Sequence, residues 1–517
     1  MNAVLMRRIR HLQRWESGTI RVLGLIELLL AAALFVCGLY AYFVGEDSTI
    51  FLYIFPIVGG LGLFQTIFFS KKEKMIPSVG ILLIAEMWAI SFVVSAIPFI
   101  IYGMSPVDSF FEGISGYTTT GASIVQDLNV LPDSLLLWRG VIQWTGGITV
   151  LISFSFLLPM IGMGGAGLNS NEFMGSDSDN YSLKITTASL NFLKVYSILT
   201  VIEIFALMAC SVSAFDSLCI SLSNIPTGGL LPRNESMACY NIYAQAVTLV
   251  FMVLGAMNFY LMFRAMFKKD GTLLRSKEAR FMIKWFLGCT VVSFLFMFIN
   301  GDLGYELEGL DTYSQYAWIS LYAVISSGTG AGFSIYSYSD VPHFMFMILM
   351  IAEFVGGTSG STAGGIKIYR LMALKSYIMG NLNRVLHPNA IYTIRADGKN
   401  MDDDAVHSAL STIFLFMLGT ILGLLIFMAL EPQIDMVTSI GIVFSAITNA
   451  GIAPVDNFGF LTFASKILLC FLMWLGRMEM VLIIILFTKG FWSDLRLSLG
   501  HSRVAKRRPH NGGYRSR

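Results

Sequence analysis

Four short turns that combine glycine with threonine, serine or asparagine are the residues best suited to chemistry in this sequence. Glycine lets the backbone turn its carbonyl groups inward without a Cβ clash, and a ring of carbonyl oxygens can replace part of a cation's hydration shell. One such turn could serve only close helix packing, but four at equivalent places favour a cation site. The turns are Thr118–Ser123, Ile225–Leu230, Ser327–Ser334 and Ile447–Ile452.

A second candidate is the segment from Gly356 to Gly365, which contains five glycines in ten residues. It interrupts a 37-residue stretch from Pro342 to Ile378, whereas one straight membrane span needs about 20 residues. The glycines predict that this helix breaks in its middle. Spacing alone leaves open whether the break is a packing kink or a functional loop.

A third candidate is Arg477, which lies 16 residues after Leu461 and 10 before Phe487 in an apolar stretch. A helix there would place it about 24 Å from one end and about 15 Å from the other. Arginine at such depth costs about 2.5–3.5 kcal/mol on insertion scales, so it must face protein or water. An ion pair with an acid such as Glu353 is one solution. Glu479 is a poor partner, because it lies about 200° around the helix.

Composition shows what kind of protein must position these residues. The chain has 517 residues, of which 55% are hydrophobic and 13% are charged, and its mean hydropathy is +0.68. Soluble globular proteins carry about 25% charged residues, so much of this surface must face lipid. The six cysteines share no Cys-x-x-Cys spacing, and the six histidines fall in termini, loops or helix ends. We therefore predict a polytopic membrane protein without a zinc site, a disulfide framework, an intramembrane haem or a nucleic-acid partner.

The order of long and short apolar segments predicts an all-α membrane protein built from repeats. A long span, a short half-span, a glycine turn and another long span occur four times. With an extra helix pair in front, this gives ten full spans and four half-spans around a pseudo-fourfold axis. The predicted parts are the helix pair 1–75, repeats 76–165, 183–270, 277–380 and 405–490, a cytoplasmic linker 381–404 and a basic cytoplasmic tail 491–517.

Charge placement supports this topology. The predicted outer segments contain sixteen acidic residues and one basic residue, Arg233. The predicted inner segments hold the basic clusters, among them Lys71–Lys74, Arg264–Lys284 and the tail. By the positive-inside rule both termini are cytoplasmic, and the acidic outer face would concentrate cations at an entrance.

Several motifs resemble the Trk/Ktr/HKT superfamily of potassium transporters, and in particular its bacterial TrkH-type subunits. The resemblance extends from about residue 20 to 493, and the extra N-terminal helix pair favours the Trk branch over the Ktr branch. The motifs are Gln143–Gly147, Leu158–Met160, Gly356–Lys367, His387–Ala390 and Leu475–Glu479.

This resemblance implies that the four turns form a potassium selectivity filter. Plant members with serine at the first filter glycine transport sodium, so Gly121 favours potassium. The sequence departs from the usual pattern at Leu230 and at Ile452–Pro454. The implied filter residues are Thr119, Thr120, Gly121, Thr227, Gly228, Gly229, Gly330, Ala331, Gly332, Asn449, Ala450 and Gly451.

The resemblance also implies a gate below the filter. The intramembrane loop 356–366 would move, Lys367 would bind carbonyls or repel ions, and Arg477 would project into the pore as an electrostatic barrier. The glycines assigned to this gate are Gly356, Gly357, Gly360, Gly364 and Gly365.

The implied function is passive or weakly coupled potassium uptake, with symport among its forms, across the bacterial inner membrane. A homodimer and a cytosolic regulatory subunit are also implied, whose RCK domains bind NAD(H) or ATP/ADP. This chain itself would hold only transported K⁺ and no organic cofactor. Two alternatives stay open: a sodium or poorly selective cation transporter, and a membrane-embedded enzyme, which would need a catalytic constellation at membrane depth.

Overall fold

A computed structural model describes residues 17–68, 77–160, 178–300, 311–387, 393–396, 399–401, 403–478, 480–493 and 495. The N-terminal arginines, Lys71–Lys74 and most of the predicted tail 491–517 lie outside the described residues. Seven described helices are long and apolar enough to cross a membrane, or nine if each of two bent pairs is one span. The prediction of a helical protein with several apolar spans is confirmed.

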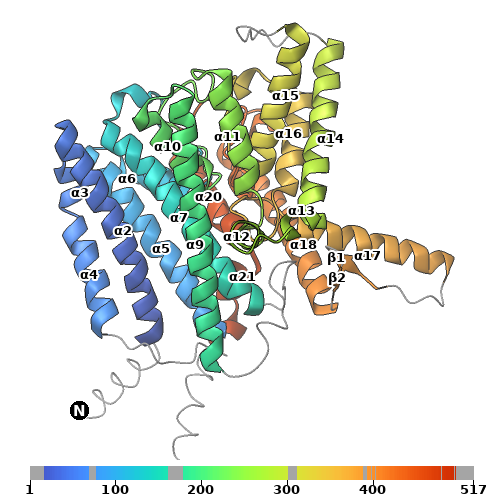
Figure 1. Cartoon of the computed structure of the whole chain (residues 1–517), viewed down its shortest axis with the longest axis horizontal. Helices are drawn as coiled ribbons and strands as arrows, with labels where there is room; N and C mark the ends of the chain where they lie inside the picture. Colours follow the sequence, from blue (N-terminus) through green and yellow to red (C-terminus); the bar gives the residue numbers. More distant parts are fainter. Residues whose placement is uncertain are drawn as a thin grey trace, which may run out of the picture.

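The predicted N-terminal helix pair forms one edge of the molecule (Figure 1). Its helices are α2 (Ser17–Val44), the single turn α3 (Thr49–Leu52) and α4 (Phe55–Phe68). Glycine allows α2 and α4 to pack closely, because a Cβ on Gly24 would lie 2.7 Å from the carbonyl oxygen of Gly62. Small residues at such contacts are typical of helix packing in membranes.

The rest of the helical body consists of four helix–turn–helix units in chain order. Each unit starts with a long helix, continues with a short helix that ends in a glycine turn, and returns through another helix. The long helices are α5 (Pro77–Tyr102), α9 (Ser178–Ala209), α14 (Lys277–Asn300) and α18 (Asp403–Leu430). The short helices are α6 (Pro106–Tyr117), α10 (Ala214–Asn224), α15 (Thr312–Thr329) and α19 (Met436–Thr448). The returning helices are α7 (Asp133–Met160), α11 (Ile242–Gly255), α16 (His343–Val355) and α20 (Phe463–Arg477).

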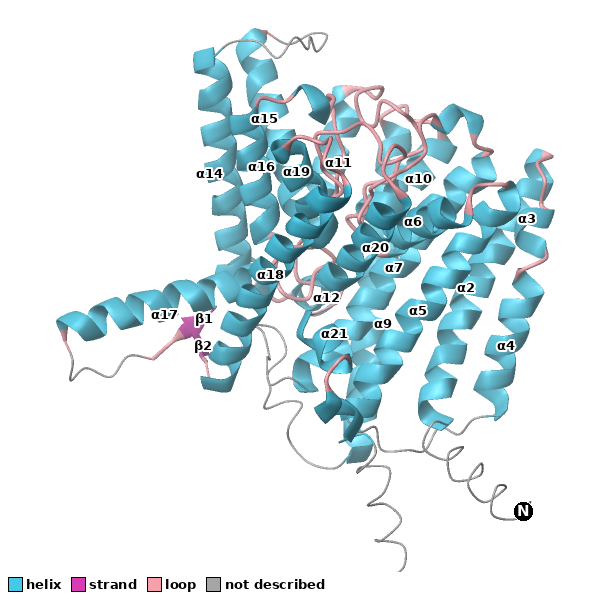
Figure 2. Cartoon of the chain, turned by 180° about the vertical axis from the view of Figure 1, so that it is seen from behind, coloured by secondary structure: helices cyan, strands magenta, loops and turns pink. Residues whose placement is uncertain are grey.

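Contacts between neighbouring units close into a cycle. The returning helix of each unit packs on the short helix of the next, so that α7 contacts α10, α11 contacts α15, α16 contacts α19 and α20 contacts α6. Seen from behind, the short helices and their turns lie within the bundle, between the longer helices (Figure 2). This cycle brings four turns that are far apart in sequence to one place.

Three of the four returning helices are broken below their turns. The breaks separate α11 from α12 (Phe259–Phe267), α16 from α17 (Ile368–Leu386) and α20 from α21 (Met480–Leu486). The first and third pairs bend by 105° and 116°. The sequence predicted the break in the α16–α17 stretch, but it gave no sign of the bends within 238–267 and 461–488.

The helix α17 leaves the body and extends sideways (Figures 1 and 2). It leads towards a small antiparallel pair of two-residue strands, β1 (Arg395–Ala396) and β2 (Lys399–Asn400). These strands lie in the predicted linker and are the only β-strands among the described residues. The remaining short helices are η1 (Leu128–Val130), α13 (Thr272–Arg275) and η2 (Tyr338–Asp340).

Candidate functional site

The four turns share one backbone conformation, which follows from how the short helices end. In each turn, an N–H beyond the end of the short helix donates to the carbonyl of a serine five residues earlier in the chain, as in the 6→1 bond of a Schellman C-cap. The four equivalent bonds are Thr120 N–Ser115 O (2.9 Å), Gly228 N–Ser223 O (2.8 Å), Ala331 N–Ser326 O (2.9 Å) and Ala450 N–Ser445 O (3.3 Å).

Each turn contains two left-handed residues separated by one residue. The first positions have φ of 53° at Thr119, 57° at Thr227, 76° at Gly330 and 58° at Asn449. A β-branched residue at positive φ is an outlier, and such backbone strain clusters at functional sites. Two threonines strained at equivalent positions therefore make these turns the candidate functional site.

The second left-handed position is a glycine in every turn, and the four glycines face a common central space. A Cβ on Gly229 would lie 3.1 Å from the carbonyl oxygen of Ala331, and a Cβ on Gly332 would lie 2.7 Å from that of Ala450. A Cβ on Gly121 would collide with the carbonyl of Gly228, and a Cβ on Gly451 with that of Thr120. Each glycine thus faces the carbonyl that precedes the glycine of a neighbouring turn. We call these four turns the carbonyl ring.

The helices that carry the ring make its centre favourable for a cation. All four short helices end at the ring, so the negative ends of their dipoles point towards it. Their opposite ends carry acids: Asp435 caps α19 by accepting from Thr438 N at 3.0 Å, and Asp108 and Asp216 lie in the first turns of α6 and α10. Acids at the N-termini stabilise these helices. A ring of carbonyls with aligned dipoles can bind a cation that has lost part of its water.

Two side chains make contacts that the sequence did not reveal and hold parts of the ring in place. Gln143 in α7 donates from Nε2 to the carbonyl oxygen of Gly228 at 2.6 Å. Asn449 donates from Nδ2 to Thr120 Oγ1 at 2.9 Å and to the carbonyl oxygen of Met473 at 2.8 Å. These bonds join the fourth turn to the first turn. They also join the second turn to α7 of the first unit. Gln143 belongs to a motif noted in the sequence, but nothing in its spacing showed what it binds.

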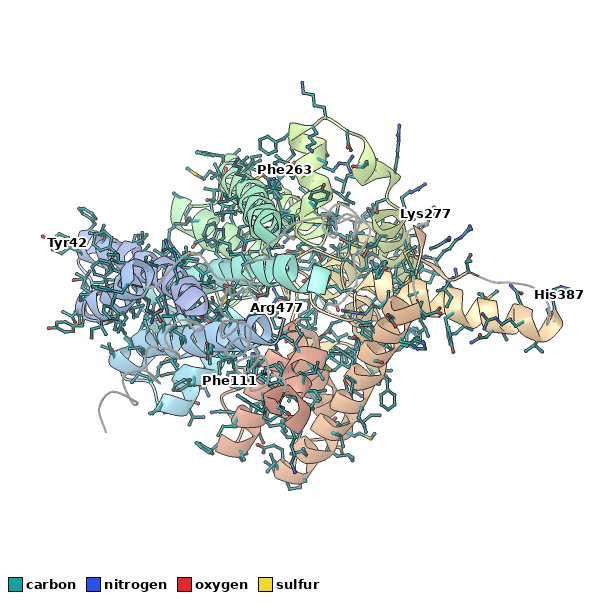
Figure 3. The ribbon with its side chains drawn as sticks, turned by 90° about the horizontal axis from the view of Figure 1, so that it is seen from below. Tyr42, Phe111, Phe263, Lys277, His387 and Arg477 are labelled. Carbon is teal, nitrogen blue, oxygen red and sulfur yellow. The ribbon has the colours of Figure 1, made fainter. Side chains whose placement is uncertain are left out.

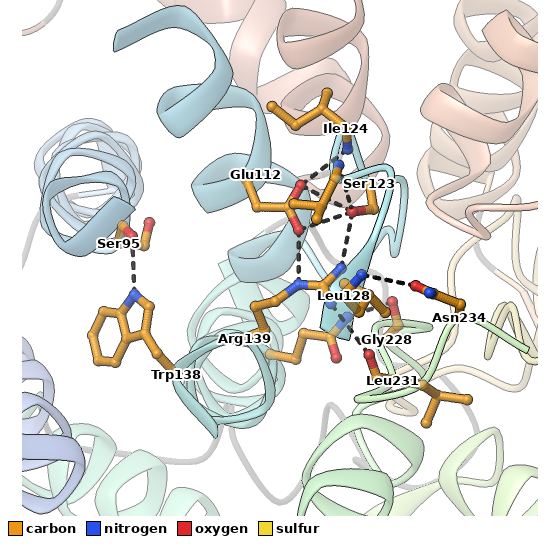
Figure 4. A network of polar contacts seen from close by, with 12 residues as sticks. Ser95, Glu112, Ser123, Ile124, Leu128, Trp138, Arg139, Gly228, Leu231 and Asn234 are labelled. Atoms are coloured by element: carbon orange, nitrogen blue, oxygen red, sulfur yellow. Dashed lines mark hydrogen bonds and ion pairs between the residues drawn. The ribbon is translucent and has the colours of Figure 1, made fainter. Parts of the chain in front are cut away.

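A buried ion pair supports the first turn from outside. Arg139 Nε donates to Glu112 Oε1 at 2.8 Å, and Arg139 also donates to Ser123 Oγ at 2.9 Å and to the carbonyl of Leu231 at 3.2 Å (Figure 4). The second carboxylate oxygen of Glu112 accepts from Ile124 N at 3.1 Å. The sequence counted Glu112 among the sixteen acids of the predicted outer segments. Its side chain is fully buried, and through Arg139 it joins the first turn to the second.

We predict that Arg139→Met lowers the free energy of unfolding by about 3–5 kcal/mol, because it leaves the Glu112 carboxylate buried and unpaired. Thermal unfolding of the purified protein measures the change. The matched control is Arg233→Met, which removes a pair with Asp216 whose arginine side chain is 46% exposed and which should cost at most about 1 kcal/mol. Equal losses in the two variants would contradict a supporting role for Arg139.

The loop between α16 and α17 packs directly under the carbonyl ring. Gly365 N donates to the carbonyl oxygen of Thr448 at 3.1 Å, and a Cβ on Gly364 would collide with that same oxygen. On the other side, Thr362 Oγ1 donates to the carbonyls of Ile225 and Gly255, both at 3.0 Å. The loop therefore bridges the undersides of the second and fourth turns.

The loop is also bound to the neighbouring bend between α11 and α12. Asn258 Nδ2 donates to the carbonyl oxygen of Ser359 at 2.6 Å, Phe259 N donates to that of Gly360 at 3.1 Å, and Thr358 N donates to that of Ala256 at 3.0 Å. Left-handed glycines shape the loop, with φ of 68° at Gly356, 71° at Gly360 and 73° at Gly365. Gly357 packs tightly as well, because a Cβ on it would lie 2.8 Å from the carbonyl oxygen of Ala256. All five predicted gate glycines thus lie within one compact loop.

Lys367 ends the loop with an unusual backbone, since its φ is 74°. Its Nζ donates to the carbonyl of Ala363 and lies 3.4 Å from both the carbonyl oxygen and the Oγ of Ser361. The sequence expectation that Lys367 binds carbonyls therefore agrees with this geometry.

Arg477 is the last residue of α20 and lies near the middle of the molecule when it is viewed from below (Figure 3). It lines a pocket together with Gly364, Gly365 and Lys367. Within the described part of the chain, Arg477 forms no ion pair, and its Nε and Nη2 have no hydrogen-bond partner. Glu353 instead accepts from Thr448 Oγ1. The structural ion pair with Glu353 is therefore excluded.

Comparison with known proteins assigns this architecture. Residues 101–495 match the TrkH family, described as cation transport protein. The chain belongs to the TrkH family.

Individual relatives agree with this assignment. The potassium uptake protein TrkG of the Escherichia coli Trk system is 31% identical over 85% of this chain and 90% of its own length. The Trk system potassium uptake protein TrkH of Halomonas elongata is 29% identical over 81% of this chain and 87% of its own. The crystal structure of the potassium transporter TrkH from Vibrio parahaemolyticus superimposes with a TM-score of 0.82 at 26% identity, covering 92% of this chain and 99% of that one.

Hydrogen bonds favour the ionised form of several acids in the loops and helix caps of this TrkH-family protein. A hydrogen bond from Asn234 Nδ2 at 2.8 Å lowers the pKa of Asp127 below its usual value. A hydrogen bond from Ser314 likewise lowers the pKa of Asp311, and the Thr438 N–H lowers that of Asp435. A group with a depressed pKa keeps its charge as the pH falls, so these acids remain negative well below neutral pH.

Proposed function

We propose that this protein takes up potassium across the bacterial inner membrane, through a pore whose selectivity filter is the carbonyl ring. The observation that carries the proposal is the cyclic approach of four equivalent glycines to four equivalent carbonyls. In this account the four helix–turn–helix units are pseudo-fourfold repeats around one pore, with ten spans in all and both termini in the cytoplasm. The names of its relatives as potassium uptake proteins agree.

The ion would lose water at the ring, where the carbonyls of the twelve predicted filter residues and the four helix dipoles replace it. Below the ring it would meet the loop from Gly356 to Lys367, and then Arg477. The loop is bonded to Thr448 in the fourth turn, so a movement of the loop would open the path. Arg477 would add a positive charge in the same path and raise the barrier for a cation.

Transport of sodium or of several monovalent cations is the competing function within this class. Glycine at the first ring position, Gly121, favours potassium over sodium. A membrane-embedded enzyme is less well supported, because no cluster of three His, Cys, Asp or Glu side chains that could hold a metal occurs among the described residues. The central feature is instead a set of main-chain carbonyls.

Assembly and regulation complete the proposal. Helix α17 exposes apolar side chains outside the body, among them Leu382 and Val385 at 55% and 80%, which suits a second copy of this chain in a homodimer. A cytosolic RCK-domain subunit that binds NAD(H) or ATP/ADP would drive the loop from below. Native mass spectrometry that shows only monomers in a mild detergent would contradict the homodimer.

The function is tested in a bacterium that lacks its own potassium uptake systems. Expression of the chain with a cognate regulatory subunit should restore growth at limiting potassium and should restore uptake of rubidium. Potassium should compete with this uptake and sodium should not. Failure to restore growth although the protein is present in the membrane would contradict the proposal, and equal competition by sodium would favour the unselective alternative.

A further inference from the structure

A buried polar cluster lies behind the second turn of the carbonyl ring. It consists of Glu203 in α9, Asn224 at the end of α10 and Thr248 in α11, and all three residues are fully buried. Asn224 Nδ2 donates to Glu203 Oε1 at 2.5 Å and to the carbonyl oxygen of Thr248 at 2.9 Å. An amide NH2 has two donors, so both are used. The three helices of the second unit are therefore joined at Asn224.

Asn224 also supports the strained residue of the second turn. Its carbonyl oxygen accepts from Thr227 N at 2.8 Å, and Thr227 is the β-branched residue with φ of 57°. Strained backbone persists only where the surrounding structure over-determines it. Thr227 is followed directly by Gly228, whose carbonyl belongs to the ring. A displacement of Asn224 would therefore be passed to a carbonyl of the ring.

Packing alone does not account for a glutamate at position 203. Within the described part of the chain Glu203 forms no ion pair, and its Oε2 has no hydrogen-bond partner. Burial of such a group costs stability, whereas an apolar side chain would fill the space without that cost. Its Oε1, however, can accept from Asn224 whether the acid is charged or neutral. This bond fixes which way the amide faces, because a reversed amide would place Asn224 Oδ1 against two oxygen acceptors.

We infer that Glu203 is a positioning residue for ion selection, which fixes the second turn through Asn224. Gln143 holds the carbonyl of Gly228 from α7, and Asn224 holds the start of the same turn from α9 and α11. Loss of the Glu203 bond would leave the turn freer to fit a cation of another size. This inference rests on the proposed function of the ring as a selectivity filter.

Rubidium uptake into liposomes that contain the purified full-length protein tests the inference, with potassium or sodium as the competitor. Glu203→Met keeps a similar volume but removes the acceptor, and should lower the preference for potassium over sodium by about threefold or more. Glu203→Gln keeps an acceptor oxygen for Asn224 and should retain the preference of the unaltered protein. An unchanged preference in Glu203→Met, or an equal loss in Glu203→Gln, would overturn the inference.

The matched control is Glu27→Met. Glu27 in α2 is 5% exposed, its Oε1 accepts from Gln65 Nε2 at 3.1 Å, and its Oε2 has no partner among the described residues. It is the same kind of buried acid with the same kind of bond, but it lies between α2 and α4 at the edge of the molecule (Figure 1). Glu27→Met should keep the potassium preference even if it unfolds at a lower temperature. An equal loss of preference in this control would overturn the specific role of Glu203.

A second variant keeps the inference testable if Glu203→Met does not fold. Serine stands at the place of Asn224 in the third turn, where the carbonyl oxygen of Ser327 accepts from Gly330 N at 2.9 Å, so Asn224→Ser suits this backbone. Its shorter side chain lacks the amide that bonds Glu203. It should lower the preference in the same direction, and an unchanged preference would overturn the inference.

Hydrogen–deuterium exchange separates this inference from the proposed function. Peptides that contain residues 225–230 should exchange faster in Glu203→Met and Asn224→Ser than in the unaltered protein and in Glu27→Met. Equal exchange in all four proteins would overturn the positioning role. If the unaltered protein shows no potassium preference, the proposed function fails, and the exchange result still decides whether Glu203 holds the turn.

Discussion

Gly121→Ser should lower the preference of uptake for potassium over sodium by about tenfold or more, equivalent to about 1.4 kcal/mol. Gly121 has φ of 85°, which a serine adopts only with strain. Its Cβ would collide with the carbonyl of Gly228 and lie 2.9 Å from the Cα of Gly229. The first turn must therefore move, and the carbonyls would no longer surround an ion of one size. Rubidium uptake in competition with potassium or sodium measures the effect.

The matched control for this substitution is Gly288→Ser. Gly288 lies in α14, and a Cβ there would have no atom within 4 Å. We expect this variant to keep the potassium preference of the unaltered protein. An unchanged preference in Gly121→Ser, at equal amounts in the membrane, would mean that the carbonyl ring does not select the ion.

Arg477→Gln should increase cation flux about tenfold. The arginine is buried, it lines the pocket under the loop, and its Nε and Nη2 have no hydrogen-bond partner among the described residues. Two unit charges 4 Å apart interact with about 4 kcal/mol at an effective dielectric constant of 20. Removal of the arginine charge can therefore lower the barrier for a passing cation by an appreciable part of this energy. Rubidium uptake into liposomes that contain the purified variant measures the change.

The matched control is Lys375→Gln, because it removes one positive charge from an exposed position on α17. Its flux should equal that of the unaltered protein. If Arg477→Gln has unchanged or lower flux at equal reconstitution, Arg477 is not a barrier to the transported cation.

Local signals in the sequence were sufficient for the short helices and their turns. Helix α6 begins and ends where the sequence carries local signals, because Ser105 caps it, Pro106 is suited to the first turn and a glycine turn follows. The broken stretch around Gly356 was predicted for a similar reason, since five glycines in ten residues cannot continue a helix. The assignment of individual filter and gate residues remains a prediction.

The bends between α11 and α12 and between α20 and α21 could not be predicted from hydrophobic periodicity. The sequence Gly255-Ala256-Met257-Asn258 is mostly apolar, so the hydropathy of 238–267 gives no sign that it is two helices. Asn258 was the available signal, because its Oδ1 accepts from Tyr260 N at 2.9 Å and from Leu261 N at 3.0 Å as an N-cap. Such a cap within an apolar run indicates a new helix start.

Long-range pairing could not be predicted from single positions. Glu112 and Arg139 are 27 residues apart on separate helices. From the sequence alone, Glu112 was as consistent with an exposed outer acid as with a buried ion pair. Gln143 and Gly228 are 85 residues apart. The first contact exists because α6 packs on α7 within one unit, and the second because α7 packs beside α10 and its turn. The second contact depends on the cycle of units and not on any local pattern.

The central claim is that the carbonyl ring binds the transported ion, and anomalous diffraction from crystals soaked in rubidium tests it most directly. The account predicts rubidium density on the axis of the ring, between the carbonyls of Thr120, Gly228, Ala331 and Ala450, and loss of that density when excess potassium is added. Rubidium density elsewhere with none in the ring, or ring density that sodium displaces as readily as potassium, would contradict it.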